Sequence, residues 1–193
     1  LCSEIEPSKN LLDFQTYILL ETGYPFEFYD LDKLKKILKT EDFELTLKSA
    51  TEKTTFVGDN NLEYNLDSNI LVVEADNYPL SIAGIIPNKT VCYTPETKSL
   101  LIEASIFNSK KIRQQSRILG LRTDRSARYE KGLNNSSFIQ SLIRLISLLK
   151  ISNPELVCKI HTTSQVEQPK LSKITLKYEN IIIHSFEPST SNL

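Results

Sequence analysis

The sequence predicts an α+β fold in which layered, mixed β-sheets are flanked by helices. Strand-like segments lie mainly between residues 43 and 86, and helix-like segments follow between residues 110 and 150. This separation of strands from helices is typical of α+β proteins. The 193 residues, 40% hydrophobic and 24% charged, suffice for one compact unit with a buried core.

The first hundred residues supply most of the expected strands. Apolar residues recur at helical spacing over 31–38, with lysines between them, which predicts an amphipathic helix there. Alternating or unbroken apolar runs predict strands elsewhere. The segments with this character are 43–47, 70–73, 80–86 and 100–102. Turn residues at 58–61 and 76–77 separate some of them.

Two further helices are expected in the second half. Ser109 can cap a helix that runs to Leu119 and ends at Gly120. Another amphipathic helix covers 138–150 and stops before an Asn-Pro pair. Short apolar runs after this helix favour strands at 157–160 and 174–176.

Positive charge is concentrated between residues 110 and 131. Eight lysines and arginines stand there against two acidic residues, although the formal net charge of the chain is −1. Such a block indicates a specific anionic partner, and a solvated helix face is the alternative. No aromatic stacking motif accompanies it, so the sequence does not support sequence-specific reading of RNA.

Other compositional features narrow the function classes. Three scattered cysteines and two histidines form no metal-binding motif, so we expect no metal site. No apolar run reaches the length of a membrane span. The carboxylate of Glu103 ends a buried strand and needs a partner or a function. An internal salt bridge with Arg122 or Arg128 is one interpretation.

Two motifs resemble the central editing module of the beta subunit of bacterial-type phenylalanyl-tRNA synthetase. Residues 100–104 read Leu-Leu-Ile-Glu-Ala, and 119–132 read Leu-Gly-Leu-Arg-Thr-Asp-x-Ser-x-Arg-Tyr-Glu-x-Gly. The family motif Gly-Gln-Pro-Leu-His-Ala-Phe-Asp is similar to Gly-Tyr-Pro-Phe-Glu-Phe-Tyr-Asp at 23–30. The resemblance implies the editing-module fold over 1–170, with a final strand and the start of a linker at 171–193.

The resemblance also implies an editing pocket that hydrolyses tyrosine wrongly attached to the phenylalanine tRNA. Glu103 would recognise the phenolic hydroxyl of that tyrosine, because an acceptor left unpaired by phenylalanine discriminates strongly. The pocket residues that we expect are Glu103, Thr123, Gly84, Pro25, Glu27 and Arg125. Thr123 with Asp124 can instead form a helix cap. Arg128 and Glu130 resemble the family's structural ion pair.

Four departures from the family pattern fall at this pocket. Glu27 replaces a histidine, Pro87-Asn88 replace two glycines, Arg125 replaces a small residue, and Glu6 stands where some relatives have arginine. Arg125 could fill the pocket or neutralise Glu103. We therefore expect editing to be weakened or lost, which leaves a structural and tRNA-positioning role. An active editing hydrolase is the alternative.

The resemblance further implies the partners of the parent enzyme, which joins phenylalanine to its tRNA using ATP and Mg²⁺. Its aminoacylation site lies on the alpha subunit, so we expect neither cofactor in this chain. Two alpha and two beta subunits would form a heterotetramer. The tRNA backbone would contact Lys110, Lys111, Arg113 and Arg117. A composition rich in Ile, Asn and Lys favours a plastid stroma over a bacterial cytoplasm. A chain without methionine is expected to be a piece of a longer protein, which argues against a free-standing RNA-binding protein.

Overall fold

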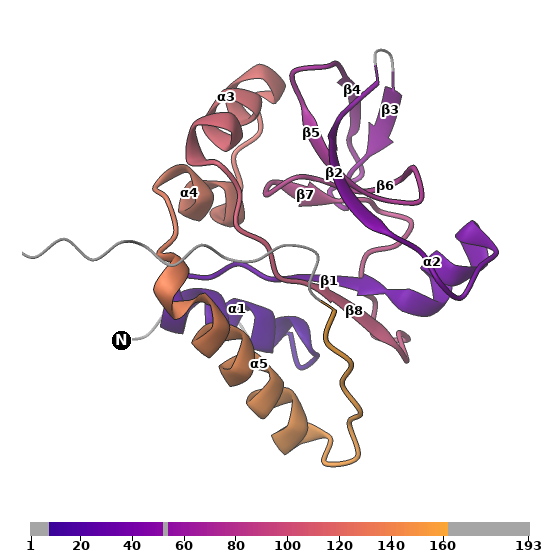
Figure 1. Cartoon of the computed structure of the whole chain (residues 1–193), viewed down its shortest axis with the longest axis vertical. Helices are drawn as coiled ribbons and strands as arrows, with labels where there is room; N and C mark the ends of the chain where they lie inside the picture. Colours follow the sequence, from indigo (N-terminus) through magenta and orange to yellow (C-terminus); the bar gives the residue numbers. More distant parts are fainter. Residues whose placement is uncertain (1–7, 52–53, 162–193) are drawn as a thin grey trace, which may run out of the picture.

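The computed structural model describes residues 8–51 and 54–161, and Figure 1 shows their arrangement. Glu6, the strand expected at 174–176 and the linker expected at 171–193 lie outside the described residues. The helices are α1 Leu12–Thr22, α2 Leu31–Leu38, α3 Ser109–Leu119, α4 Asp124–Glu130, the 3-10 turn η1 Asn135–Ser137, and α5 Phe138–Ser152. The strands are β1 Glu27–Asp30, β2 Leu45–Ser49, β3 Thr54–Val57, β4 Glu63–Leu66, β5 Leu71–Ala75, β6 Tyr78–Ile82, β7 Ile86–Pro87 and β8 Leu100–Glu103.

The described strands form three sheets, all with antiparallel pairing. Four strands are ordered β2-β5-β6-β7, while β3 pairs with β4 and β1 pairs with β8. The expected α+β class is confirmed, but the described sheets are antiparallel rather than mixed. Helices α1 and α5 lie together below the β1–β8 ribbon, and α3 and α4 lie above it beside the larger sheet (Figure 1).

The β1–β8 ribbon separates two hydrophobic cores. Side chains alternate across a strand, so successive residues face opposite sides. Phe28 packs with Ile18 of α1 and Leu145 of α5 in one core. Its neighbour Tyr29 packs on the other side, in the core that contains the larger sheet and Tyr129 of α4. The ribbon is therefore buried on both faces, as the burial of all four β1 residues indicates.

Most expected helices are confirmed, and their ends follow local chemistry. Helix α2 has the predicted bounds, and the side chain of Asp30 caps it by accepting a hydrogen bond from Lys33 N. Helix α3 ends at Leu119 as predicted, but it begins at Ser109, one residue early, because its cap is Asn108 rather than Ser109. The Asn108 side chain accepts hydrogen bonds from the backbone of Lys110 and Lys111. Asparagine and serine are both favoured at the N-cap, so the sequence could not show which of the two residues caps the helix.

Two strand predictions were wrong. The run 80–86 is interrupted by a turn at 83–85, because Gly84 adopts a left-handed φ of +67° and reverses the chain between β6 and β7. An apolar run gives no signal for such a reversal. Residues 157–160 form no strand; they are exposed and follow the end of α5. Within the described ranges, no helix combines the length and apolar character needed to cross a membrane.

Candidate functional site

Two glutamates meet across the β1–β8 ribbon. Glu27 is the direct antiparallel partner of Glu103, so their side chains project from the same face. Tyr29, two residues along β1, shares that face. All three side chains are buried. The ribbon therefore brings the expected pocket residues Glu27 and Glu103 together, next to a tyrosine that we did not predict.

The Glu103 carboxylate is bound by the chain itself. The Tyr29 hydroxyl donates a 2.7 Å hydrogen bond to Glu103 Oε2. Burial raises the pKa of Glu103, and the hydrogen bond from Tyr29 opposes that rise. Burial and the nearby Glu103 charge together hold the pKa of Tyr29 well above its ordinary value. The tyrosine thus remains a neutral donor towards this carboxylate.

The ion pairs considered for Glu103 and Arg128 were wrong. Arg122 lies near Glu130 instead, with 3.9 Å between Arg122 Nη2 and Glu130 Oε2. Arg128 is exposed, and it forms no ion pair with any residue that the structure describes. The expected structural pair of Arg128 with Glu130 is therefore replaced by a pair with Arg122.

Arg125 forms a buried ion pair with Glu27. Its side chain is 13% exposed and that of Glu27 is 6% exposed. Gln15 Nε2 donates to the other oxygen, Glu27 Oε1, at 3.0 Å, and the backbone N–H of Phe28 donates to it at 3.2 Å. Arg125 therefore neutralises Glu27 and not Glu103. Two departures from the family motif, at positions 27 and 125, are complementary charges in one contact.

The buried guanidinium is incompletely satisfied. Arg125 Nε is enclosed and has no hydrogen-bond partner among the residues that the structure describes. Burial lowers the pKa of Arg125, because the charged form loses its hydration. Buried polar groups of this kind usually have partners. Among the described residues, Glu27 is the ion-pair partner of this guanidinium.

Thr123 has the structural role that was the alternative to the pocket. Its Oγ1 accepts a hydrogen bond from Ser126 N at 3.2 Å and donates one to Ile85 O at 3.0 Å. The Ser126 hydroxyl in turn accepts from Thr123 N, which completes a capping box at the start of α4. Thr123 therefore fixes α4, and with it Arg125, against the turn after β6.

Pro25 and Gly84 converge on the buried ring of Tyr129. The Tyr129 hydroxyl donates to Pro25 O at 3.2 Å and to Ser105 O at 3.0 Å. A Cβ added to Gly84 would lie 3.0 Å from Tyr129 Cδ2, 3.0 Å from Ile112 Cδ1 and 3.1 Å from Phe107 Cδ2. Protein side chains therefore already occupy the space beside Gly84.

Pro87 and Asn88, which replace two glycines of the family, also have structural contacts. Pro87 lies in β7, and the Asn88 amide donates to Pro79 O at 2.9 Å. The Asn88 side-chain oxygen accepts from Thr90 N at 2.9 Å. These contacts tie the edge of the four-stranded sheet, so the extra bulk at 87–88 has a local structural explanation.

Sequence reasoning missed Tyr29 and Tyr129 as members of this site. Tyr29 had a signal in the motif itself, because the family motif has phenylalanine at that position and this chain adds one hydroxyl. Tyr129 belongs to the matching motif, but its side chain reaches the Pro25 carbonyl only through the folding of α4 onto β1. The pairing of Glu27 with Arg125 likewise needs the tertiary structure, because 97 residues separate them in sequence order.

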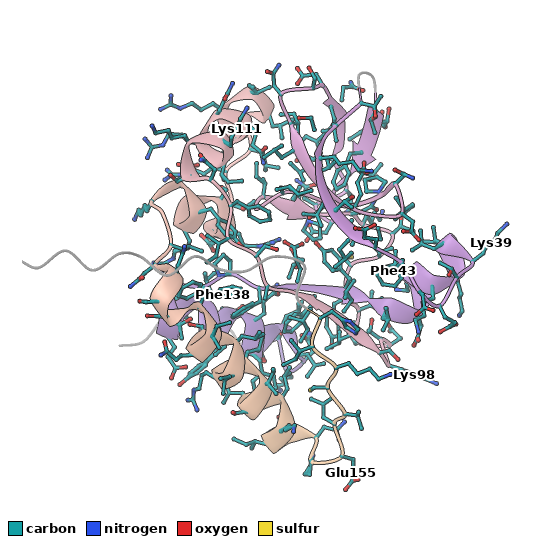
Figure 2. The ribbon with its side chains drawn as sticks, viewed as in Figure 1. Lys39, Phe43, Lys98, Lys111, Phe138 and Glu155 are labelled. Carbon is teal, nitrogen blue, oxygen red and sulfur yellow. The ribbon has the colours of Figure 1, made fainter. Side chains whose placement is uncertain are left out.

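The basic block occupies the outer surface of α3 and α4. Lys110, Lys111, Arg113 and Arg117 are exposed on α3, and Lys111 points outward in Figure 2. Helix α3 contains no acidic residue. No cluster of three or more metal-ligating His, Cys, Asp or Glu side chains occurs in the described ranges. The exposed cations can attract an anion, whereas Arg125 of the same block is buried.

Comparison with known proteins gives the family. The model of the B3/4 domain matches residues 1–153. The chain is 53% identical over 180 residues to a chloroplastic phenylalanine–tRNA ligase beta subunit of Phaeodactylum tricornutum, which covers 93% of this chain and 26% of the relative. Corresponding beta subunits of Prochlorococcus marinus subsp. pastoris and Synechococcus elongatus are 31% and 33% identical, over 93% and 92% of this chain and 22% of each relative.

The chain thus spans about a quarter of the length of these relatives. The resemblance seen in the motifs is confirmed by matches that extend over most of the chain. The relatives are beta subunits of a ligase, and the domain match covers the whole of the described fold up to the end of α5. The chain belongs to the B3/4 domain family.

Proposed function

We propose that this chain is part of a phenylalanine–tRNA ligase beta subunit, and that its module positions tRNA and supports the assembly while its editing site is weakened or lost. The parent enzyme would charge phenylalanine tRNA with ATP and Mg²⁺ through its alpha subunit. The high identity to a chloroplastic beta subunit supports the first part of this proposal. The state of the Glu103 site supports the second.

The observation that carries the loss of editing is the hydrogen bond from Tyr29 to Glu103. In the family that the chain resembles, the matching glutamate accepts a hydrogen bond from the phenol of a misattached tyrosine. Here a phenol of the chain itself occupies Oε2. A substrate tyrosine would share this carboxylate with an internal donor that is already in place, so its hydroxyl would bring a smaller net gain. The discrimination between tyrosine and phenylalanine weakens accordingly.

The Arg125–Glu27 pair fills space on the same face of the ribbon. Both side chains are buried next to the ribbon position of Glu103. Moving either one to admit a ligand would leave a buried charge without its partner, which is strongly unfavourable. The gap beside Gly84 is filled by Tyr129, Phe107 and Ile112. These contacts favour a closed site.

The alternative is an active hydrolase for Tyr-tRNA(Phe). One observation favours it: Glu103 is retained at the ribbon, buried, and next to the other expected pocket residue Glu27. If small movements of Arg125 and Tyr29 accompany tRNA binding, this carboxylate would again be available. The two proposed functions differ in one measurable activity, the hydrolysis of Tyr-tRNA(Phe).

The test is deacylation of Tyr-tRNA(Phe) by the assembled full-length enzyme. We expect wild-type protein to leave the ester at its spontaneous rate. The triple variant Tyr29→Phe, Glu27→His, Arg125→Ala restores the family residues at 27 and 29 and a small residue at 125, with Pro87 and Asn88 unchanged. We expect it to hydrolyse Tyr-tRNA(Phe) but not Phe-tRNA(Phe). Aminoacylation by each protein controls for folding.

Two results decide against the closed site. Wild-type hydrolysis that disappears in Glu103→Gln would establish the active hydrolase instead. Failure of the triple variant, with aminoacylation intact, would show that Tyr29 and the ion pair are not what blocks the site.

The remaining partners follow from the same assignment. We propose the alpha subunit as the direct protein partner, in a heterotetramer of two alpha and two beta subunits, and the plastid stroma as the compartment. Neither ATP nor Mg²⁺ is expected to bind this module. Native mass spectrometry of the co-expressed full-length subunits tests the stoichiometry, and a mass other than that of two alpha and two beta subunits contradicts it.

A further inference from the structure

The surface where the end of α3 meets α4 is hollowed into an open concavity of about 370 Å³. Its lining includes three arginines, Arg113, Arg117 and Arg122, and one carboxylate, Glu130. Three cations and one anion leave two excess positive charges, on a chain whose formal net charge is −1. The concavity is therefore a local attractor for anions.

Glu130 orients two of these arginines. Arg113 Nη2 donates a 3.3 Å hydrogen bond to the backbone oxygen of Glu130, and Arg122 Nη2 lies 3.9 Å from Glu130 Oε2. The Glu130 side chain is only 12% exposed, whereas that of Arg122 is 67% exposed. The carboxylate therefore lies at the floor and the guanidinium faces solvent. The hydrogen bond of Arg113 reduces the freedom that its guanidinium loses when it binds an anion.

The turn after α3 fixes the opposite wall. Gly120 adopts a left-handed φ of +60°, and the Ser116 hydroxyl donates to Leu121 O at 2.6 Å. Arg117, in the last turn of α3, is exposed, and the residues that the structure describes provide no hydrogen bond or ion pair for its guanidinium. Arg117 is thus a cation at the rim that is available to a ligand.

The chemistry of the concavity favours phosphate groups. Guanidinium groups bind phosphate oxygens through paired hydrogen bonds, and the volume lies within the range of small-ligand sites. The exposed Lys110 and Lys111 continue the positive surface along α3, which has no acidic residue. A row of cations beyond a concave site suits a chain of successive phosphates better than an isolated anion.

We propose that this concavity binds phosphodiester groups of an RNA backbone, with Arg117 and Arg122 in direct contact and Glu130 as a positioning residue. The inference rests on the proposed tRNA-positioning function and narrows it to one place. It adds the cation Arg122 and the carboxylate of Glu130 to the tRNA-contacting residues expected from the sequence. It is independent of the state of the Glu103 site.

Fluorescence anisotropy of a labelled phenylalanine tRNA, with the assembled full-length enzyme at several salt concentrations, tests the proposal. The variant Arg117→Gln, Arg122→Gln should weaken binding about tenfold at low salt and reduce the salt slope by about 1.5, as expected for two lost phosphate contacts. The control Lys36→Gln, Lys39→Gln also removes two exposed cations, near the far end of the molecule at α2 (Figures 1 and 2). It should change neither quantity.

Glu130→Gln distinguishes positioning from simple charge competition. If Glu130 orients Arg122, this variant should bind tRNA more weakly. Tighter binding would mean that the carboxylate merely repels phosphate, which contradicts the positioning role. Unchanged thermal unfolding temperatures establish that the variants are folded.

The remaining outcomes separate this inference from the proposed function. If the arginine variant binds tRNA as tightly as wild type, the concavity is not the binding site, although the module can still position tRNA. No wild-type binding at all overturns the tRNA role. Competition decides the ligand: polyadenylate should displace the tRNA far better than inorganic phosphate or polyglutamate at equal anion concentration. Equal displacement by either competitor overturns the assignment to RNA.

Discussion

Two arginine–glutamate contacts of the same molecule have the same chemistry but differ in burial and in distance from solvent. Arg125 and Glu27 are buried together beside the β1–β8 ribbon, with side chains 13% and 6% exposed. Arg122 and Glu130 lie at the surface, 3.9 Å apart, and Arg122 is 67% exposed. In the first contact, removal of either charge would leave the other buried without its partner. In the second, solvent screens the attraction and the arginine remains available to a ligand.

The comparison teaches that burial, and not residue type, decides whether an arginine of this domain fills the Glu103 region or remains available to bind a ligand. Both arginines belong to one basic block in the sequence. Helix α4 turns Arg125 inwards through its capping box at Thr123, whereas Arg122 lies before that cap and faces the concavity. Only two residues therefore separate the surface cation Arg122 from the buried cation Arg125.

The largest expected effect is that of breaking the buried pair. Arg125→Ala leaves Glu27 buried without its partner and should lower the free energy of unfolding by about 3–5 kcal/mol, measured by urea denaturation of the assembled subunit. The double variant Arg125→Leu, Glu27→Leu removes both charges and should recover most of that loss. A single variant as stable as wild type would contradict the importance of the pair.

Removing the Tyr29 hydroxyl should have a smaller effect. Tyr29→Phe leaves Glu103 Oε2 without this donor and should cost about 1–3 kcal/mol of stability at neutral pH. Tyr64→Phe is a matched control, since the Tyr64 hydroxyl accepts its 2.7 Å hydrogen bond from Asn60 in an exposed turn. Equal costs in urea unfolding for the two variants would argue that the Tyr29 contact has no special role.

The dependence of stability on pH should identify Glu103. Its pKa is raised in the folded state, mainly by burial, so the folded protein holds this proton more tightly than the unfolded chain. The stability due to this group is complete below its ordinary pKa of 4.5 and is lost as the pH rises through the raised value. Glu103→Gln should remove that loss.

The measurement is the difference in unfolding free energy between wild type and Glu103→Gln across this pH range. The variant should gain relative to wild type as the pH rises above 4.5. The comparison with one variant cancels groups of opposite sign, such as Asp30, whose pKa is lowered. A difference that does not vary with pH would mean that Glu103 titrates normally.

The surface pair should contribute least to stability. Arg122→Gln breaks a contact between an exposed cation and Glu130 and should change the unfolding free energy by no more than about 1 kcal/mol. The residual effect should decline further at high salt. A cost similar to that of Arg125→Ala in the same urea assay would remove the distinction on which the comparison depends.

The sequence was a good guide where one local pattern decides the outcome. Amphipathic spacing predicted α2 with its observed bounds, and cap residues predicted α3 to within one residue. The alternation after residue 43 led to β2 with a shift of two residues. It failed at Gly84, because an apolar run reads the same whether the chain continues or reverses. It also failed at 157–160, where apolar residues stay exposed.

The site required information that is not local. The resemblance identified Glu103, Glu27 and Arg125 as neighbours, but the carboxylate that it suggested for Arg125 was Glu103, whereas the structure pairs Arg125 with Glu27. That choice depends on the β1–β8 register and on the direction of α4. The hydroxyl of Tyr29 was visible as a single difference from the family motif, yet its target followed only from the ribbon geometry.

The placement of the β1–β8 ribbon between two cores has a consequence for how this domain can diverge. Neighbouring residues of β1 serve different cores, with Phe28 on the α1–α5 side and Tyr29 on the other. Substitutions at 29 and 103 therefore alter one face of the ribbon and leave the α1–α5 core on the other face unchanged, whereas Glu27 also contacts Gln15 of α1. The polar residues on one face of the ribbon can therefore change during evolution while the apolar packing on its other face is kept.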